Sequence, residues 1–203
     1  MPKNAHLCPI RFTLYYGYYG LKRLSDDTAI FVAGQGLDSG GTTGWPNTGG
    51  RDVAFARALY EQVSYDYCID EERVFSTGMS YGGIMSNTLG CAMGDIFRAI
   101  APMSGMGPSL FTWGSQCTGQ VAAWIAHGAN DSVIALSSGQ ASRDHWLEEN
   151  GCSANSYHPV DPDPCVAYEQ CDDGYPVQWC ELDGGHTIPS FASEAIWNFF
   201  VQF

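Results

Sequence analysis

The sequence predicts an α/β fold, a mostly parallel sheet with helices on both faces. Short apolar runs rich in β-forming residues alternate with segments whose apolar residues recur at helical spacing. Helices between successive strands are the connections that a parallel sheet needs. With 203 residues, 45% of them hydrophobic and 15% charged, the chain has the size and composition of one globular unit. We therefore expect a single domain over 1–203, with 1–17 as an irregular N-terminus.

The elements follow in order along the chain. The run Ala29–Ala33 is apolar throughout and suits a strand that is buried on both faces. Further strands are expected at 73–77, 99–103, 121–126 and 175–182, and helices at 52–67, 84–93, 138–150 and 191–203. Gly151 follows the third helix as a C-cap. Residues 152–174 contain three Cys and three Pro and are expected to form a loop tied by disulfides.

Charge and hydropathy exclude several classes of partner. The net charge is −13 with only nine Lys and Arg, so no basic surface for nucleic acid is expected. No apolar run approaches the roughly 18 residues of a membrane span. No motif points to a metal or another cofactor, and none is expected.

Eight cysteines indicate an oxidising compartment, since no Cys-x-x-Cys pair suggests zinc. The strand before Ser80 rises about five residues at ~3.3 Å each, and the helix after it descends about ten at ~1.5 Å. The rise of the strand and the descent of the helix nearly cancel, so Cys91 is expected at the same height along the strand direction as Cys68. We therefore predict a Cys68–Cys91 disulfide.

The sequence Gly78-Met79-Ser80-Tyr81-Gly82 lies between an expected strand and an expected helix. This is the context in which Gly-x-Ser-x-Gly carries a serine nucleophile on a strained turn. Gly78 and Gly82 are expected to leave room for the turn, and the backbone N–H of Tyr81 to stabilise an oxyanion. The alternative is an ordinary serine in a glycine-rich turn.

A serine nucleophile needs a base and an acid that orients the base. His186 lies in a glycine-rich loop just past an expected strand and is the best base. Asp131 also follows a strand, and the order Ser80, Asp131, His186 is the one found in α/β-hydrolases. Asp183 is the rival acid. Four other histidines are less suitable: His127 is interpreted as structural, His145 as solvated in mid-helix, His158 as part of the loop, and His6 is unassigned.

Six segments in conserved order and spacing resemble secreted fungal feruloyl esterases, the group related to polyhydroxybutyrate depolymerases. They are 44–55 (GWPNTGGRDVAF), 75–83 (FSTGMSYGG), 127–133 (HGANDSV), 150–152 (NGC), 172–177 (DDGYPV) and 185–187 (GHT). The resemblance covers roughly 18–203. It implies an α/β-hydrolase with Ser80, Asp131 and His186 as its triad, acting on hydroxycinnamate esters of plant cell-wall polysaccharides. Trp45 is expected near the acyl pocket, or else in a packing role.

The N-terminal part departs from the family pattern. We find no signal peptide in Met1–Pro9 and no His-x-x-Gly-Gly-like loop to supply a second oxyanion N–H. We therefore expect a truncated or wrongly spliced chain whose first strands are missing, although its relatives act outside the cell. An active ester hydrolase is the favoured hypothesis. The alternatives are a catalytically impaired homologue, an acetylxylan esterase or a polyester depolymerase.

Overall fold

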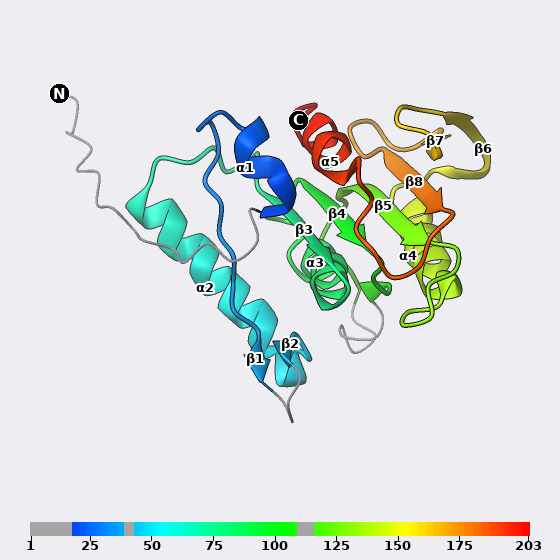
Figure 1. The fold of residues 1–203 in the computed structure, drawn as a ribbon. Helices are drawn as coiled ribbons and strands as arrows, with labels where there is room; N and C mark the ends of the chain where they lie inside the picture. The colour runs from blue at the N-terminus through cyan, green and yellow to red at the C-terminus, as the bar shows by residue number, and fades with distance from the viewer. Residues whose placement is uncertain (1–17, 39–42, 109–115) are drawn as a thin grey trace.

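The computed structural model describes residues 18–38, 43–108 and 116–203. Its centre is a six-stranded sheet in the order β3-β4-β5-β8-β7-β6 (Figure 1). The first four of these strands run parallel, and β7 and β6 continue the sheet antiparallel. The strands are β3 (Phe75–Met79), β4 (Ala99–Met103), β5 (Ala122–Gly128), β6 (Ser153–Pro159), β7 (Cys165–Glu169) and β8 (Val177–Leu182).

Helices cover both faces of the sheet. Alternate residues of the central strands point to opposite faces, so Trp124 packs with α1 (Leu21–Leu24) and α5 (Ala192–Phe200). Ile125, its neighbour, packs on the other face with α3 (Tyr81–Ala92) and α4 (Leu136–Glu149). The amphipathic helix α2 (Arg51–Asp66) adds its apolar residues to that second face. The predicted layered α/β fold is confirmed.

The predicted helices and four of the predicted strands are found with ends shifted by a few residues. Helix α4 ends at Glu149, and Gly151 then takes a φ of +65°, the left-handed conformation expected beyond a helix C-terminus. Short elements precede this framework. They are the 3₁₀ turns η1 (Tyr18–Gly20) and η2 (Thr48–Gly50) and a two-residue pairing of β1 (Leu37–Asp38) with β2 (Thr43–Gly44).

The predicted strand Ala29–Ala33 is wrong. This segment is not part of a sheet, and Ile30 is 51% exposed. Between it and β3 lies a cavity of about 680 Å³, lined by 28–34 on one side and 75–78 on the other. Among the described residues no strand pairs with the outer edge of β3, although the Tyr19 hydroxyl accepts a hydrogen bond from the Met79 N–H at 3.2 Å. An apolar run becomes a strand only where a neighbouring strand lies within ~4.8 Å to bond its backbone.

The expected loop at 152–174 is instead largely the antiparallel pair β6 and β7. Cys152–Cys171 closes the base of this pair, and Cys165–Cys180 joins β7 to β8 at directly opposed residues. The cysteines and prolines were the features that favoured a loop, yet all three prolines lie at or between the strand ends. Cross-strand cysteines are compatible with a ladder, because opposed residues lie close enough for a disulfide.

The predicted Cys68–Cys91 disulfide is also wrong. Cys91 bonds to Cys117, and Cys68 is exposed and has no disulfide partner within 18–38, 43–108 and 116–203. Element lengths do not fix the direction in which the Cys91 side chain points around the helix axis. That direction is toward the segment before β5, where the Thr118 N–H also donates to the Cys91 carbonyl. Cys8 lies outside the described residues.

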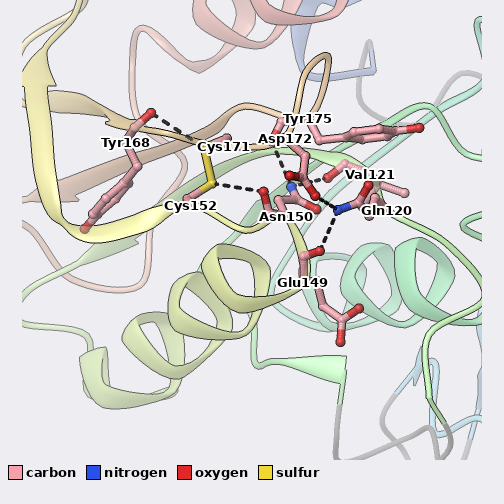
Figure 2. Close-up of a disulfide and its surroundings, with 9 residues drawn as sticks. All are labelled: Gln120, Val121, Glu149, Asn150, Cys152, Tyr168, Cys171, Asp172 and Tyr175. Atoms are coloured by element: carbon pink, nitrogen blue, oxygen red, sulfur yellow. Dashed lines mark hydrogen bonds between the residues drawn. A yellow bond between two sulfur atoms is a disulfide. The ribbon is translucent and has the colours of Figure 1, made fainter.

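Hydrogen bonds join the carboxyl end of α4 to the sheet beside the Cys152–Cys171 disulfide (Figure 2). Asn150 is fully buried, and its side-chain amide donates to the carbonyls of Val121 at 2.8 Å and Tyr175 at 3.0 Å. Gln120 bridges the Glu149 carbonyl and the Asp172 carboxylate at 2.7 Å each. One buried amide therefore links α4, the start of β5 and the segment before β8.

Replacing Asn150 with alanine is expected to lower the free energy of unfolding by about 2 to 4 kcal/mol, because two buried carbonyls lose their donor and a small cavity is left. Chemical denaturation measures this change. Gln120→Ala is the control: its bonded acceptors are more exposed, and it should cost about 1 kcal/mol. Equal losses in the two variants would contradict the role given to Asn150.

In the part of the chain that the structure describes, no helix is both long and apolar enough to cross a membrane.

Candidate active site

Ser80 sits on a sharp turn between the carboxyl end of β3 and the start of α3. Its φ is +58° and its ψ is −119°, a strained combination for a residue with a side chain. The turn is held on both sides: the Ser80 N–H donates to the Met103 carbonyl at 3.0 Å, and the Ser80 carbonyl accepts from the Ile84 N–H at 2.9 Å. Strain retained in this way is typical of a functional residue presented at a sheet edge.

Close packing of the turn depends on Gly78, as the sequence suggested, and on Gly83 in place of Gly82. A Cβ at Gly78 would lie 2.4 Å from the backbone carbon of Gly82, and one at Gly83 would lie 2.5 Å from the Met103 carbonyl oxygen. Among the described residues, a Cβ at Gly82 would meet only the Tyr19 hydroxyl, at 3.8 Å. The expectation that Gly82 is needed for space is therefore wrong, and Gly83 takes that role, because the helix backbone approaches β4 there.

Asp131 and His186, predicted from separate loops, are brought together. Nδ1 of His186 lies 2.7 Å from Oδ2 of Asp131. The Asp131 side chain is fully buried, and that of His186 is 18% exposed. Asp131 follows the end of β5 and His186 the end of β8, and these neighbouring strands finish at the same edge of the sheet as β3. An imidazole that is held by one nitrogen and partly open to solvent is arranged to exchange a proton through the other.

The two loops are joined through their backbones. The Ala129 N–H donates to the Leu182 carbonyl at 2.7 Å, and the Asn130 N–H to the Gly184 carbonyl at 2.8 Å. A Cβ at Gly128 would lie 2.3 Å from the Gly185 carbonyl oxygen, so a side chain there would push the loops apart. The acid and the base are therefore positioned by main-chain contacts, which hold them more firmly than side chains alone.

The Asp131 carboxylate is held in its charged form. Burial raises its pKa, but the hydrogen bond with His186 and the N–H groups of Ile134 and Val133 outweigh burial and lower the pKa to about 2. Those two N–H groups both donate to Oδ1, at 2.9 and 2.8 Å, which leaves Oδ2 for His186.

Because its pKa lies below the ordinary value of 3.8, Asp131 stabilises the fold above about pH 4 and loses that contribution as the pH falls toward 2. The contribution expected at neutral pH is about 2 kcal/mol. Denaturation of wild type and Asp131→Asn from pH 7 to pH 2 measures it. The difference in unfolding free energy should shrink with falling pH, and a constant difference would contradict the assignment.

The remaining candidates lie apart from this pair. Asp183 is exposed, and its carboxylate accepts a hydrogen bond from the Asn130 amide at 3.1 Å. His158 is exposed beside Glu169. His145 is not solvated as expected: it lies half-buried with Nε2 3.4 Å from the Cys117 sulfur, and burial lowers its pKa. His6 lies outside the described residues.

Cys91, Cys117 and His145 form the one cluster of three potential metal ligands among the described residues. Their ligand atoms lie within 4.8 Å of one another. The two sulfurs are joined in a disulfide, so neither is available as the thiolate that a metal would bind.

Tyr81 and Trp45 flank the turn without lying in one pocket. Tyr81 is the first residue of α3, and its ring packs closely against Gly44. Trp45 stacks on Phe55 with ring centroids 6.2 Å apart and is half-buried. It lines the 680 Å³ cavity, which reaches Gly78 and Gly82 but has neither Ser80 nor His186 among its described lining residues.

The sheet order, the serine turn and the likeness to solved esterases define an α/β-hydrolase. Acetyl xylan esterase from Aspergillus awamori superimposes with a TM-score of 0.57 at 19% identity, covering 76% of this chain and 69% of that one. A carboxylesterase of Bacillus cereus gives 0.58 at 13% identity, covering 83% and 73%. A family model described as the prolyl oligopeptidase family matches residues 41–138.

The chain belongs to the family of fungal feruloyl esterases. It is 35% identical over 192 residues to feruloyl esterase C of Emericella nidulans, which covers 91% of this chain and 68% of that protein. Feruloyl esterase D of Neurospora crassa is 37% identical over 202 residues, covering 92% and 66%. The chain therefore spans about two thirds of the length of these relatives and belongs with the carboxylic ester hydrolases.

Proposed function

We propose that this protein is a serine esterase that releases ferulic or related hydroxycinnamic acids from plant cell-wall polysaccharides. Ser80 is the nucleophile, His186 the general base and Asp131 the acid that orients the base. The observation that carries this proposal is the part-buried Asp131–His186 hydrogen bond at the sheet edge where β3 presents Ser80 on its strained turn. Membership of the feruloyl esterase family supports the substrate class.

The reaction proceeds in two acyl transfers. Nε2 of His186 takes the proton as the Ser80 oxygen attacks the ester carbonyl. The tetrahedral intermediate collapses, and the sugar alcohol leaves with the proton from His186. A water molecule, deprotonated by the same nitrogen, then attacks the acyl carbonyl. His186 returns that proton to the Ser80 oxygen as its bond to the hydroxycinnamate breaks. Asp131 keeps the proton on Nδ1 of His186 and stabilises the imidazolium in both acyl transfers.

The Tyr81 backbone N–H is the proposed oxyanion donor. It is the first N–H of α3, where the helix leaves its leading N–H groups without intrahelical acceptors. The positive end of the helix dipole adds to its effect on a developing negative charge. Since this donor is a backbone group, its contribution depends on the geometry of the turn and not on the tyrosine side chain.

Trp45 is proposed to contact the aromatic acyl group at the border of the turn. Trp45→Leu is then expected to raise KM for methyl ferulate about tenfold and to leave KM for ethyl acetate within twofold, because only the aromatic ester offers a ring to stack on. A similar change for both esters would assign Trp45 to packing against Phe55 alone.

The partner is a feruloylated polysaccharide or a small hydroxycinnamate ester, and the site of action is extracellular. The three disulfides support an oxidising destination. The test is release of ferulate from feruloylated arabinoxylan oligosaccharides by wild type and by Ser80→Ala. We expect wild type to release ferulate and Ser80→Ala to lose this release. Hydrolysis of acetyl esters without ferulate release would favour an acetylxylan esterase, and no Ser80-dependent hydrolysis would favour an impaired homologue.

A further inference from the structure

A second histidine contacts the proposed catalytic acid from inside the sheet. His127 belongs to β5 and is fully buried. Its Nε2 lies 2.9 Å from the Ile134 carbonyl oxygen and 3.5 Å from Oδ2 of Asp131. Oδ2 of Asp131 is also the oxygen that bonds Nδ1 of His186. The Asp131 carboxylate therefore lies between two imidazoles, one facing solvent and one buried.

The contacts of His127 fix which of its nitrogens carries the proton. A carbonyl and a carboxylate only accept hydrogen bonds, so Nε2, which faces both, must donate. The principal acceptor is the Ile134 carbonyl, and Asp131 Oδ2 is a second, longer contact of the same N–H. Nδ1 is buried and has no hydrogen-bond partner among the described residues. The Nε2–H is directed at the turn that holds Asp131.

The surrounding backbone prevents the ring from turning. A Cβ at Gly139 would lie 2.3 Å from Nδ1 of His127, so the backbone of α4 packs directly on the ring. The turn from Asp131 to Ile134 is thus closed twice: Asp131 Oδ1 accepts from the Ile134 N–H, and the Ile134 carbonyl accepts from His127. An unsatisfied Nδ1 is a cost that ordinary packing does not require.

We propose that His127 is a positioning residue for catalysis, acting through Asp131. Its Nε2–H closes the turn of residues 131–134 and stops the carboxylate from rotating about its side-chain bond. Oδ2 then stays in line with Nδ1 of His186. This inference rests on the proposed function, since it assigns His127 to the same proton-transfer unit. The effect of His127 on the rate passes through the Asp131 carboxylate, which a purely structural role would not require.

A double-mutant cycle tests that route. His127→Leu is expected to lower kcat for p-nitrophenyl acetate about 10- to 100-fold, with KM changed less than twofold. His127→Gln, which restores an N–H donor, should recover most of the rate. In the Asp131→Asn background, where the carboxylate is already lost, His127→Leu should cost less than about twofold. Equal losses in both backgrounds would overturn the proposal. His158→Leu, an exposed histidine, is the control.

A second test uses the wild-type protein, so its result depends neither on how a variant folds nor on the rate of catalysis. Nitrogen-15 NMR of the histidine side chains should show His127 protonated on Nε2 alone, and His127→Gln identifies its signals. Protonation on Nδ1 would overturn the proposal even in an active enzyme. Absence of Ser80-dependent hydrolysis in wild type would instead refute the proposed function and leave the tautomer result standing.

Discussion

Replacing Ser80 with alanine is expected to lower kcat for ester hydrolysis by about 10⁴-fold or more, because the acyl-enzyme can no longer form. The loss should appear equally with methyl ferulate and with a simple acetyl ester, since both acyl groups pass through the same oxygen. Initial rates with purified protein, followed by chromatography of the released acid, measure it.

The fold should survive this change. Alanine adopts the same positive φ at no greater cost than serine, and the two backbone hydrogen bonds of the turn are unaffected. Ser137→Ala, an exposed position on α4, is the matched control and should retain full activity. A Ser80→Ala protein that is folded and still hydrolyses either ester at the wild-type rate would refute the nucleophile assignment.

Alanine at Gly78 is expected to damage both the stability and the activity of the protein. Its Cβ would lie 2.4 Å from the backbone carbon and 2.6 Å from the carbonyl oxygen of Gly82, and neither atom is the end of a flexible side chain. We expect a loss of about 3 kcal/mol or more in unfolding free energy, with kcat at least 10²-fold lower because the turn must widen. Thermal denaturation and initial rates measure both effects.

The matched control is the other glycine of the motif. Gly82→Ala places its Cβ 3.8 Å from the Tyr19 hydroxyl, an ordinary contact, within a helix that alanine favours over glycine. Stability within about 1 kcal/mol of wild type and nearly unchanged kcat are expected. If the Gly82 variant were as damaged as the Gly78 variant, the steric account of the turn would be wrong.

The features that sequence could predict are those with a local cause. The turn at Ser80 joins a β-forming run directly to a helical segment, so strand, turn and helix were all visible in about 20 residues around it. Asp131 and His186 were predicted because polar residues after buried strands converge at one sheet edge. Their hydrogen bond supports that reasoning about topology.

The features that could not be predicted from the sequence depend on contacts that form only in the folded chain. Ala29–Ala33 has the composition of a buried strand but no strand beside it in the described chain, so composition alone misled. The partner of Cys91 depended on the direction of one side chain around a helix. The contact of His127 with Asp131 arises only when the chain turns back after β5, and the i, i+4 spacing of the two residues was the available hint.

Covalent labelling tests the central claim most directly. The folded protein would be treated with a fluorophosphonate and examined by intact mass and peptide mapping. One adduct on Ser80 is the predicted result, slowed strongly in Asp131→Asn and hardly at all in Asp183→Asn, because the buried carboxylate orients His186 while the exposed one bonds Asn130. No adduct on Ser80 in protein shown to be folded, or equal labelling rates in the two aspartate variants, would contradict it.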